Sequence, residues 1–259
     1  MSNSALVNYV KISPNRNTPR NHEIDTVTIH MTEGQVSVET LGDIFAKESR
    51  KASCNYGIGS DGRIGMYCPE SDRSWCSGNR ANDNRAITIE CSSNKTAPYA
   101  VKEVVYNRLI DLLVDIVKRN PGFKGSLRWK GNKNLVGKID QQNMSLHKWF
   151  ENTNCPGEWL ESRMDKIAEA VNDRLSAYSA DDIVYYMGTK EYKKSIELLK
   201  RAVELDPNDF IIIGNLGYSY ELAEDYLNAK KWYEYMLKMD NPNAVEYGKQ
   251  GLEYIKGKY

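Results

Sequence analysis

The chain has neither a surplus of one charge nor a long hydrophobic run. In 259 residues, 35 Lys and Arg side chains balance 35 Asp and Glu side chains. A protein whose main partner is nucleic acid or an anionic membrane carries a basic surplus, so neither is expected as the main partner. No apolar run approaches the roughly 20 residues that a membrane-spanning helix needs.

Cysteine is scarce, and the N-terminus has no secretory pattern. The five cysteines stand at positions 54, 68, 76, 91 and 155, an odd number that excludes a fully paired disulfide framework and favours a reducing compartment. Cys68 and Cys76 are expected to be small buried thiols rather than an exported pair. The first residues lack the basic and apolar segments of a signal peptide, so we expect a cytoplasmic stage after synthesis.

The first part of the chain, up to residue 179, mixes strand and helix patterns. Thr26–Met31 and Ala86–Cys91 are rich in β-branched residues and are predicted to be buried strands. Two further strands, Asn55–Gly59 and Arg63–Cys68, flank a hairpin turn. Helices are predicted at Val38–Ser49, Val101–Arg119 and Trp159–Ala177, and a long surface loop at residues 121–144. This order indicates one α/β domain over residues 1–179, a mixed central sheet flanked by helices.

The second part, residues 180–259, is predicted to be all helical with an internal repeat of 34 residues. Tyr192 recurs as Tyr226, and Ala202 recurs as Met236. This period resembles that of tetratricopeptide repeats. It predicts a shortened repeat at 181–209, a full repeat at 210–243 and a capping helix at 244–256. Six aromatic residues at helical spacings are expected mostly to pack between helices: Tyr218, Tyr220, Tyr226, Trp232, Tyr233 and Tyr235.

Two histidines and one cysteine have the character of metal ligands. His30 ends the first predicted strand, and His147 and Cys155 lie in one short segment that ends in Cys-Pro-Gly. Imidazole and thiolate are the ligands that Zn²⁺ prefers, and three protein ligands leave a fourth position for water. Alone, a histidine at a strand end is more often structural, so the case for His30 depends on the other two residues.

Glu90 is the candidate general base. It interrupts the apolar strand Ala86–Cys91, where a carboxylate is costly and burial would raise its pKa towards the working range of a base. The alternative is a glutamate at the strand edge that faces solvent.

Several segments resemble the zinc-dependent N-acetylmuramoyl-L-alanine amidases, the group of autolysins, phage endolysins and peptidoglycan recognition proteins. The resemblance covers roughly residues 8–175 and is carried by these segments: Pro19–His30, Ala52–Arg63, Arg73–Trp75, Asn82–Glu90 and His147–Gly157. It implies that His30, His147 and Cys155 bind zinc and that Glu90 is catalytic. It further implies that Thr153 stabilises the oxyanion, at a position where relatives carry Lys or Thr.

The chain departs from these relatives at two positions. Cys54 stands where one branch has a tyrosine, and Cys76 follows Trp75 where relatives often read Trp-His. Trp75 and Asn55 are the predicted substrate contacts, although Trp75 is as easily explained as a core residue. The departure at Cys76 puts a substrate contact from that position in doubt.

The resemblance implies a peptidoglycan hydrolase that cleaves the bond between the lactyl group of N-acetylmuramic acid and L-alanine, by a zinc-activated water with Glu90 as general base. Two alternatives remain: a peptidoglycan-binding module without catalysis, and a cytoplasmic amidase that recycles muropeptides. A third question is the partner of the helical tail, which could be another protein, the cell wall or a second copy of the chain. We expect the enzyme to act on the wall after release, as an endolysin or by another export route.

Overall fold

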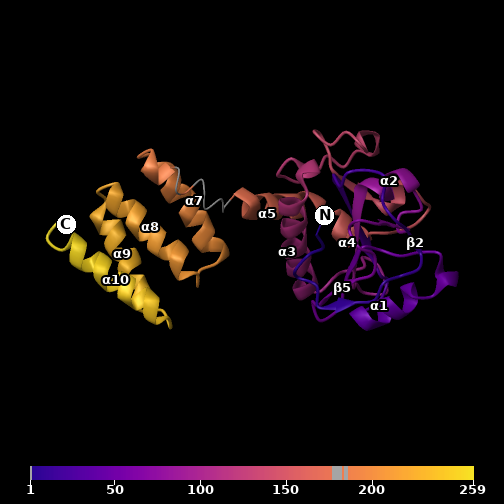
Figure 1. Cartoon of the computed structure of the whole chain (residues 1–259), viewed down its shortest axis with the longest axis horizontal. Helices are drawn as coiled ribbons and strands as arrows, with labels where there is room; N and C mark the ends of the chain where they lie inside the picture. The colour runs from indigo at the N-terminus through magenta and orange to yellow at the C-terminus, as the bar shows by residue number, and fades with distance from the viewer. Residues whose placement is uncertain (1, 177–182, 184–185) are drawn as a thin grey trace. The chain divides into compact units, whose positions relative to one another are not determined.

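The chain forms two compact units, Met1–Asn172 and Asp173–Tyr259 (Figure 1). The computed structural model describes residues 2–176, 183 and 186–259. The domain boundary predicted between residues 179 and 180 lies outside the described residues, so it stays a prediction.

A six-stranded mixed sheet forms the centre of the first unit, with strand order β1-β5-β4-β7-β3-β8. The bounds are β1 (Tyr9–Val10), β3 (Thr26–Met31), β4 (Tyr56–Ile58), β5 (Ile64–Met66), β7 (Ala86–Cys91) and β8 (Met144–Leu146). β4, β7, β3 and β8 run parallel to one another, and β4 and β5 form the antiparallel hairpin. A separate ribbon pairs β2 (Arg16–Asn17) with β6 (Arg73–Ser74).

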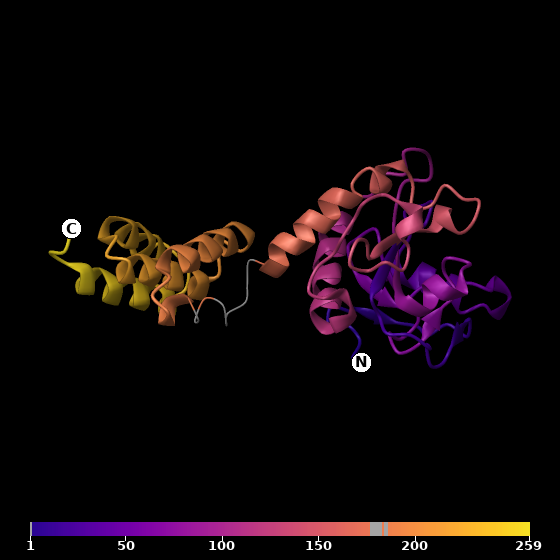
Figure 2. The same cartoon turned by 90° about the horizontal axis from the view of Figure 1, so that it is seen from above.

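Helices flank this sheet (Figure 2). They are α1 (Val38–Phe45), α2 (Arg80–Arg85), α3 (Glu103–Arg119), α4 (Glu158–Glu161) and α5 (Met164–Ser176). α1 packs on β1, β4 and β5, and α3 packs on β4. The predicted mixed sheet with flanking helices is therefore confirmed.

Two predicted helices differ from the observed ones at points where side chains hydrogen-bond to main-chain carbonyl groups. The helix predicted at Val38–Ser49 ends at Phe45, whose carbonyl accepts a hydrogen bond from the Ser13 hydroxyl at 2.6 Å. The helix predicted at Trp159–Ala177 breaks into α4 and α5, where Arg163 and Ser162 both donate to the Trp159 carbonyl. Residue 177 lies outside the described residues.

The predicted loop at residues 121–144 is mostly irregular, but its last residue begins β8. Three residues are too few for a periodic pattern, so the sequence did not predict this strand.

In the part of the second unit that the structure describes, four helices pack together. They are α7 (Tyr192–Leu205), α8 (Phe210–Leu222), α9 (Tyr226–Met236) and α10 (Pro242–Ile255). Side chains cap three of their N-termini, because Asp209, Asp225 and Asn241 accept hydrogen bonds from the first backbone N–H groups of α8, α9 and α10. The predicted start of the first repeat at residue 181 lies outside the described residues.

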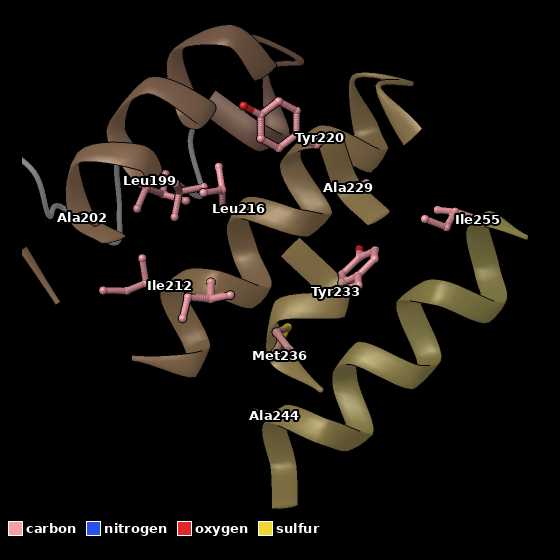
Figure 3. Packing of buried hydrophobic residues seen from close by; sticks show 12 residues of the cluster. Leu199, Ala202, Ile212, Leu216, Tyr220, Ala229, Tyr233, Met236, Ala244 and Ile255 are labelled. Atoms are coloured by element: carbon pink, nitrogen blue, oxygen red, sulfur yellow. The ribbon is translucent and has the colours of Figure 1, made fainter. Parts of the chain in front are cut away.

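The 34-residue spacing reappears in the packing of these helices. α7 begins at Tyr192 and α9 at Tyr226, and the repeat partners Ala202 and Met236 are both buried. Figure 3 shows Leu199 and Leu216 meeting between α7 and α8, and Tyr233 and Met236 between α9 and its neighbours. The helical repeat is thus a packed unit with its own hydrophobic core.

The aromatic residues of this unit divide into buried and exposed groups. Tyr220 and Tyr233 are buried, and Tyr226 and Trp232 pack against the core, as predicted. Tyr218 and Tyr235 are 45% and 41% exposed, so the packing role does not hold for them. Among the described residues, no helix has both the length and the hydrophobicity that a membrane crossing needs.

Candidate metal centre and active site

Parallel strands place His30 and Glu90 side by side. His30 is the last residue but one of β3 and is paired in register with Glu90 on β7. Residues in register on neighbouring strands point to the same face of a sheet. His30 is fully buried, and burial, with a smaller effect of His147, lowers its pKa well below the usual value. The ring is therefore neutral at physiological pH, the form that binds a metal.

His147 approaches His30 from the next strand. It follows β8, which pairs with β3, and begins the short 3-10 helix His147–Trp149. The two histidine rings lie 4.8 Å apart between centroids. His147 Nε2 lies 3.2 Å from a carboxylate oxygen of Glu151, which leaves Nδ1 for another partner. A carboxylate on the far nitrogen is the usual way to orient a metal-binding histidine.

Cys155 completes the cluster from the turn before α4. Its Sγ lies 3.4 Å from His30 Nδ1 and accepts a hydrogen bond from the Met31 backbone N–H at 3.4 Å. The Cys155 backbone N–H donates to the Thr153 hydroxyl oxygen at 3.2 Å, which fixes the turn. Burial, with a smaller effect of Glu90, raises the pKa of the Cys155 thiol well above its usual value. A metal ion would reverse this, because coordination removes the thiol proton.

These three side chains fit a metal ion. Their ligand atoms lie within 4.8 Å of one another. Nitrogen and sulfur ligands of one tetrahedral zinc are about 3.6 Å apart, and His30 Nδ1 and Cys155 Sγ are 3.4 Å apart. His30 and the segment that holds His147 and Cys155 are far apart in the sequence, and their three side chains form one candidate metal site.

Glu90 lies beside this cluster with one carboxylate oxygen in use. The Cys76 thiol donates to Glu90 Oε1 at 3.9 Å, whereas Oε2 is buried and has no hydrogen-bond partner among the described residues. Burial raises the pKa of Glu90 to about 8, although the charge of Arg50 lowers it. The carboxyl group can therefore accept and release a proton near neutral pH.

An open cleft of about 440 Å³ leads to these residues. Glu90, His147 and Cys76 lie in its lining, together with Trp75. Trp75 is half-buried and its indole N–H donates to Asn17 Oδ1 at 2.7 Å, so the ring forms a fixed wall. Three arginines also line the cleft: Arg50, Arg73 and Arg80. The cleft thus combines an aromatic surface with positive charge.

Asn55 has a structural role instead of the predicted substrate contact. It is fully buried, its amide oxygen accepts from the Thr88 backbone N–H, and its amide nitrogen donates to the carbonyls of Cys68 and Pro69. Both ends of the amide are used inside the protein, so none is left for a substrate. Asn55, just before β4, thus connects this strand to Thr88 on β7.

Sequence reasoning missed two contributors to the site. Glu151 pairs with His147 four residues earlier, a spacing that a search for carboxylates near the histidine would have found. Gly78 has a positive φ of +67°, where a side chain would be strained, and a Cβ there would also force the Glu151 carboxylate to shift. The second contributor, Cys76, carries no local signal, because its contact with Glu90 depends on the fold.

A larger hollow, of about 640 Å³, lies within the helical unit between α8 and α10. Its lining includes the exposed rings of Tyr218, Tyr247 and Tyr254, and it contains no histidine or cysteine. The chemistry therefore belongs to the smaller cleft of the first unit.

An open cleft beside three nitrogen and sulfur donors and a carboxylate is typical of metal-dependent hydrolases. Comparison with known proteins agrees with this class. The profile of the N-acetylmuramoyl-L-alanine amidases matches residues 20–158, and a tetratricopeptide-repeat profile matches residues 184–209. The first match spans more than half of the chain, which therefore belongs to the N-acetylmuramoyl-L-alanine amidase family. It is an enzyme that hydrolyses peptidoglycan, with a tetratricopeptide motif in its C-terminal unit.

Several solved structures are similar to the chain. The amidase LysC from Clostridium intestinale URNW shares 19% identity, with a TM-score of 0.43, over 64% of this chain and 95% of that one. A selenomethionine derivative of AmpD shares 18% identity, with a TM-score of 0.47, over 64% and 96%. The catalytic domain of XlyA shares 14% identity, with a TM-score of 0.43, over 63% and 97%. A comparison with curated proteins gave no match.

Proposed function

We propose that the enzyme is zinc-dependent and cleaves the amide bond between the lactyl group of N-acetylmuramic acid and L-alanine. His30, His147 and Cys155 would hold the ion. The observation that carries this proposal is the convergence of three donor atoms beside Glu90, with His147 and Glu90 in the lining of an open cleft. Three nitrogen and sulfur ligands with access for water are characteristic of catalytic zinc sites.

The chain's own residues would move the protons. A zinc ion held there would polarise the scissile carbonyl and lower the pKa of a nearby water molecule. Glu90 takes a proton from the attacking water and passes it to the amine of L-alanine as the carbon–nitrogen bond breaks. The lactyl group keeps the new carboxylate, and the stem peptide leaves with a free amino terminus. Burial raises the pKa of Glu90 to about 8 in the metal-free protein, and a zinc ion beside it would lower that pKa and favour the carboxylate that a base needs.

Thr153 is the proposed hydrogen-bond donor to the oxyanion. Its hydroxyl oxygen already accepts a hydrogen bond from the Cys155 backbone N–H, so the hydroxyl proton is free to point elsewhere. A fixed donor aimed at developing negative charge stabilises the transition state more than the ground state. A neutral hydroxyl is a weaker stabiliser than an ammonium group in the same place.

The lining of the cleft suits a peptidoglycan fragment. Trp75 offers a flat apolar face, and Arg50, Arg73 and Arg80 offer positive charge to carboxylates of the stem peptide. We expect Trp75 to contact the substrate through its ring, since the indole N–H is held by Asn17.

Release of new L-alanine amino termini from purified sacculi tests the function. We expect Glu90→Gln to lower kcat by at least about 100-fold, because the amide cannot act as a base, while zinc content stays the same. Glu103→Gln, an exposed change at the start of α3, is the matched control and should keep native activity. Substantial turnover by the zinc-loaded Glu90→Gln protein would refute the role of Glu90.

A peptidoglycan-binding module without catalysis is the second candidate, and the retained cysteine ligand argues against it. The same assay, run after chelation and again after zinc is restored, separates the two functions. Amino termini that vanish and return with zinc support the amidase. Binding to sacculi without new amino termini, at full zinc occupancy, would support the module.

We also propose that the substrate is the intact wall, reached after release of the enzyme, and not soluble muropeptides in the cytoplasm. The cleft of about 440 Å³ is open to solvent, which supports this choice. Higher kcat/KM on sacculi than on soluble anhydro-muropeptides is the expected result, and the reverse preference would favour recycling.

A further inference from the structure

Two buried side-chain atoms have no hydrogen-bond partner in the described part of the chain, and both lie in one place. They are His30 Nε2 and Glu90 Oε2, on residues paired in register across β3 and β7. An unpartnered buried polar atom is costly unless a ligand or an ion satisfies it. The candidate zinc site leaves His30 Nε2 without a partner, because His30 faces Cys155 through its other nitrogen, Nδ1.

Cys76 adds a third donor to this pair. A ring nitrogen of His30, Cys76 Sγ and a carboxylate oxygen of Glu90 all lie within 4.8 Å of one another. Cys76 Sγ and Glu90 Oε1 are 3.9 Å apart, close to the about 3.6 Å between sulfur and oxygen ligands of one tetrahedral zinc. Nitrogen, sulfur and oxygen together suit Zn²⁺ or Co²⁺ better than Mg²⁺ or Ca²⁺.

The backbone around Cys76 holds it in position. The Cys76 N–H donates to Asp83 Oδ2 at 3.2 Å, and the Ser77 hydroxyl donates to Asp83 Oδ1 at 2.6 Å. On the other side, the Trp75 N–H donates to the Ser53 hydroxyl at 3.1 Å. Cys76 and Glu90 both line the open cleft, so an ion can reach them from solvent.

We propose that His30, Cys76 and Glu90 form a second divalent-cation site, which shares His30 with the first and inhibits the enzyme when filled. The second ion replaces protons at His30 Nε2, at the Cys76 thiol and at Glu90 if that carboxyl group is protonated, and these protons pass to solvent. His30 would then offer one ring nitrogen to each ion. That the ion inhibits depends on the proposed role of Glu90 as the base, whereas its binding does not.

The second site is the weaker of the two. Arg50, Arg73 and Arg80 line the same cleft, and an ion at the first site adds further positive charge. The second ion therefore binds only after the first equivalent, when the divalent metal is in excess.

Titration of the metal-free full chain with Co²⁺ and with Zn²⁺ tests the site. Thiolate-to-cobalt charge transfer should appear with the first equivalent, from Cys155, and rise again with the second, from Cys76. Cys76→Ser should bind one equivalent and lose the second rise. Cys68→Ser, which changes a buried thiol outside both ligand sets, should bind two equivalents like the native protein.

Activity gives a second readout. At a zinc concentration about tenfold above the second dissociation constant, native activity should fall about tenfold from its value at one equivalent. For Cys76→Ser, the ratio of these two activities should stay near one. A native protein that binds a single equivalent, or a second equivalent that survives unchanged in Cys76→Ser, would overturn the proposal.

The remaining outcomes separate this site from the proposed function. If Cys76→Ser does not fold, the native protein alone tests the second site. Its thiolate-to-cobalt charge transfer should rise between the first and second equivalents, and no rise would refute the site. An active Glu90→Gln protein would refute the base role while leaving the two-ion stoichiometry of the native protein intact. A second ion that binds without inhibition would refute the inhibitory part of the proposal.

Discussion

Glu90 is held where an ionised carboxylate is unfavourable, and its protonation is therefore linked to folding. Burial raises its pKa from 4.5 to about 8. Between these values the folded, metal-free protein binds more protons than the unfolded chain, so the free energy of unfolding falls as pH rises. The stabilisation is complete below about pH 4.5 and is lost as pH passes through about 8, with an upper bound of about 5 kcal/mol.

Denaturant unfolding in chelator at pH 5 and pH 8.5 measures this effect. The native protein should lose more stability over that range than Glu90→Gln, whose side chain does not titrate. Other titrating groups are common to both proteins and cancel in the comparison. Parallel pH curves for the two proteins would contradict the prediction.

Replacing Thr153 with valine removes the hydroxyl group and keeps nearly the same side-chain shape. Thr153→Val should lower kcat by about 100-fold or more with little change in KM, because the donor to the oxyanion is lost. Thr153→Ser keeps the hydroxyl and should stay near native activity.

Thr153 also holds the turn at Cys155, so zinc content must be measured for each variant. A Thr153→Val protein with full zinc and native kcat would rule out the oxyanion role.

At the scale of elements, the catalytic strands were predictable and the groups that align them were not. Thr26–Met31 and Ala86–Cys91 were predicted with their observed bounds, because β-branched residues in short runs are a local signal. The candidate metal ligands stood out for a similar reason, since histidine is rare here and cysteine nearly so. Cys76 was missed because its contact with Glu90 depends on the fold, whereas Glu151 lies only four residues after its partner His147 and carries a local signal.

A buried polar network links the two strands that lead to the histidines. Asn82 donates to the Thr28 hydroxyl on β3 at 2.9 Å and accepts from the Ser145 hydroxyl on β8 at 2.9 Å. Thr28 and Ser145 each lie two residues before a candidate ligand, His30 and His147. Asn82 therefore fixes the relative position of the two strand ends.

Asn82→Ala should lower the free energy of unfolding by about 1–3 kcal/mol, because two buried hydroxyls lose a partner. It should also weaken zinc binding, as the two histidines lose their alignment. Asn94→Ala, an exposed change, is the control. Calorimetry and zinc titration of both variants measure the two effects, and native zinc affinity in Asn82→Ala would contradict the alignment role.

At the scale of the whole molecule, chemistry and helical repeat belong to different units. All three candidate metal ligands and Glu90 lie in Met1–Asn172, whereas the tetratricopeptide motif lies in Asp173–Tyr259 and packs around its own core. A ligand that binds only the folded form of one unit stabilises that unit alone. Metal removal should therefore lower the stability of Met1–Asn172 and leave the stability of Asp173–Tyr259 unchanged.

Calorimetry of the full chain with zinc and with chelator tests this separation. At a free zinc concentration about 100 times the dissociation constant, binding adds about 2.7 kcal/mol, which shifts the Tm of a unit of this size by roughly 5–10 °C. Chelation should lower the Tm of the metal-binding unit by that amount. The His147→Ala protein should show this lower Tm both with and without zinc. The transition of the helical unit, followed by the loss of far-ultraviolet helical signal, should keep its Tm. A single transition that moves as a whole would show instead that the two units unfold together, since the metal would then stabilise helices that it does not touch.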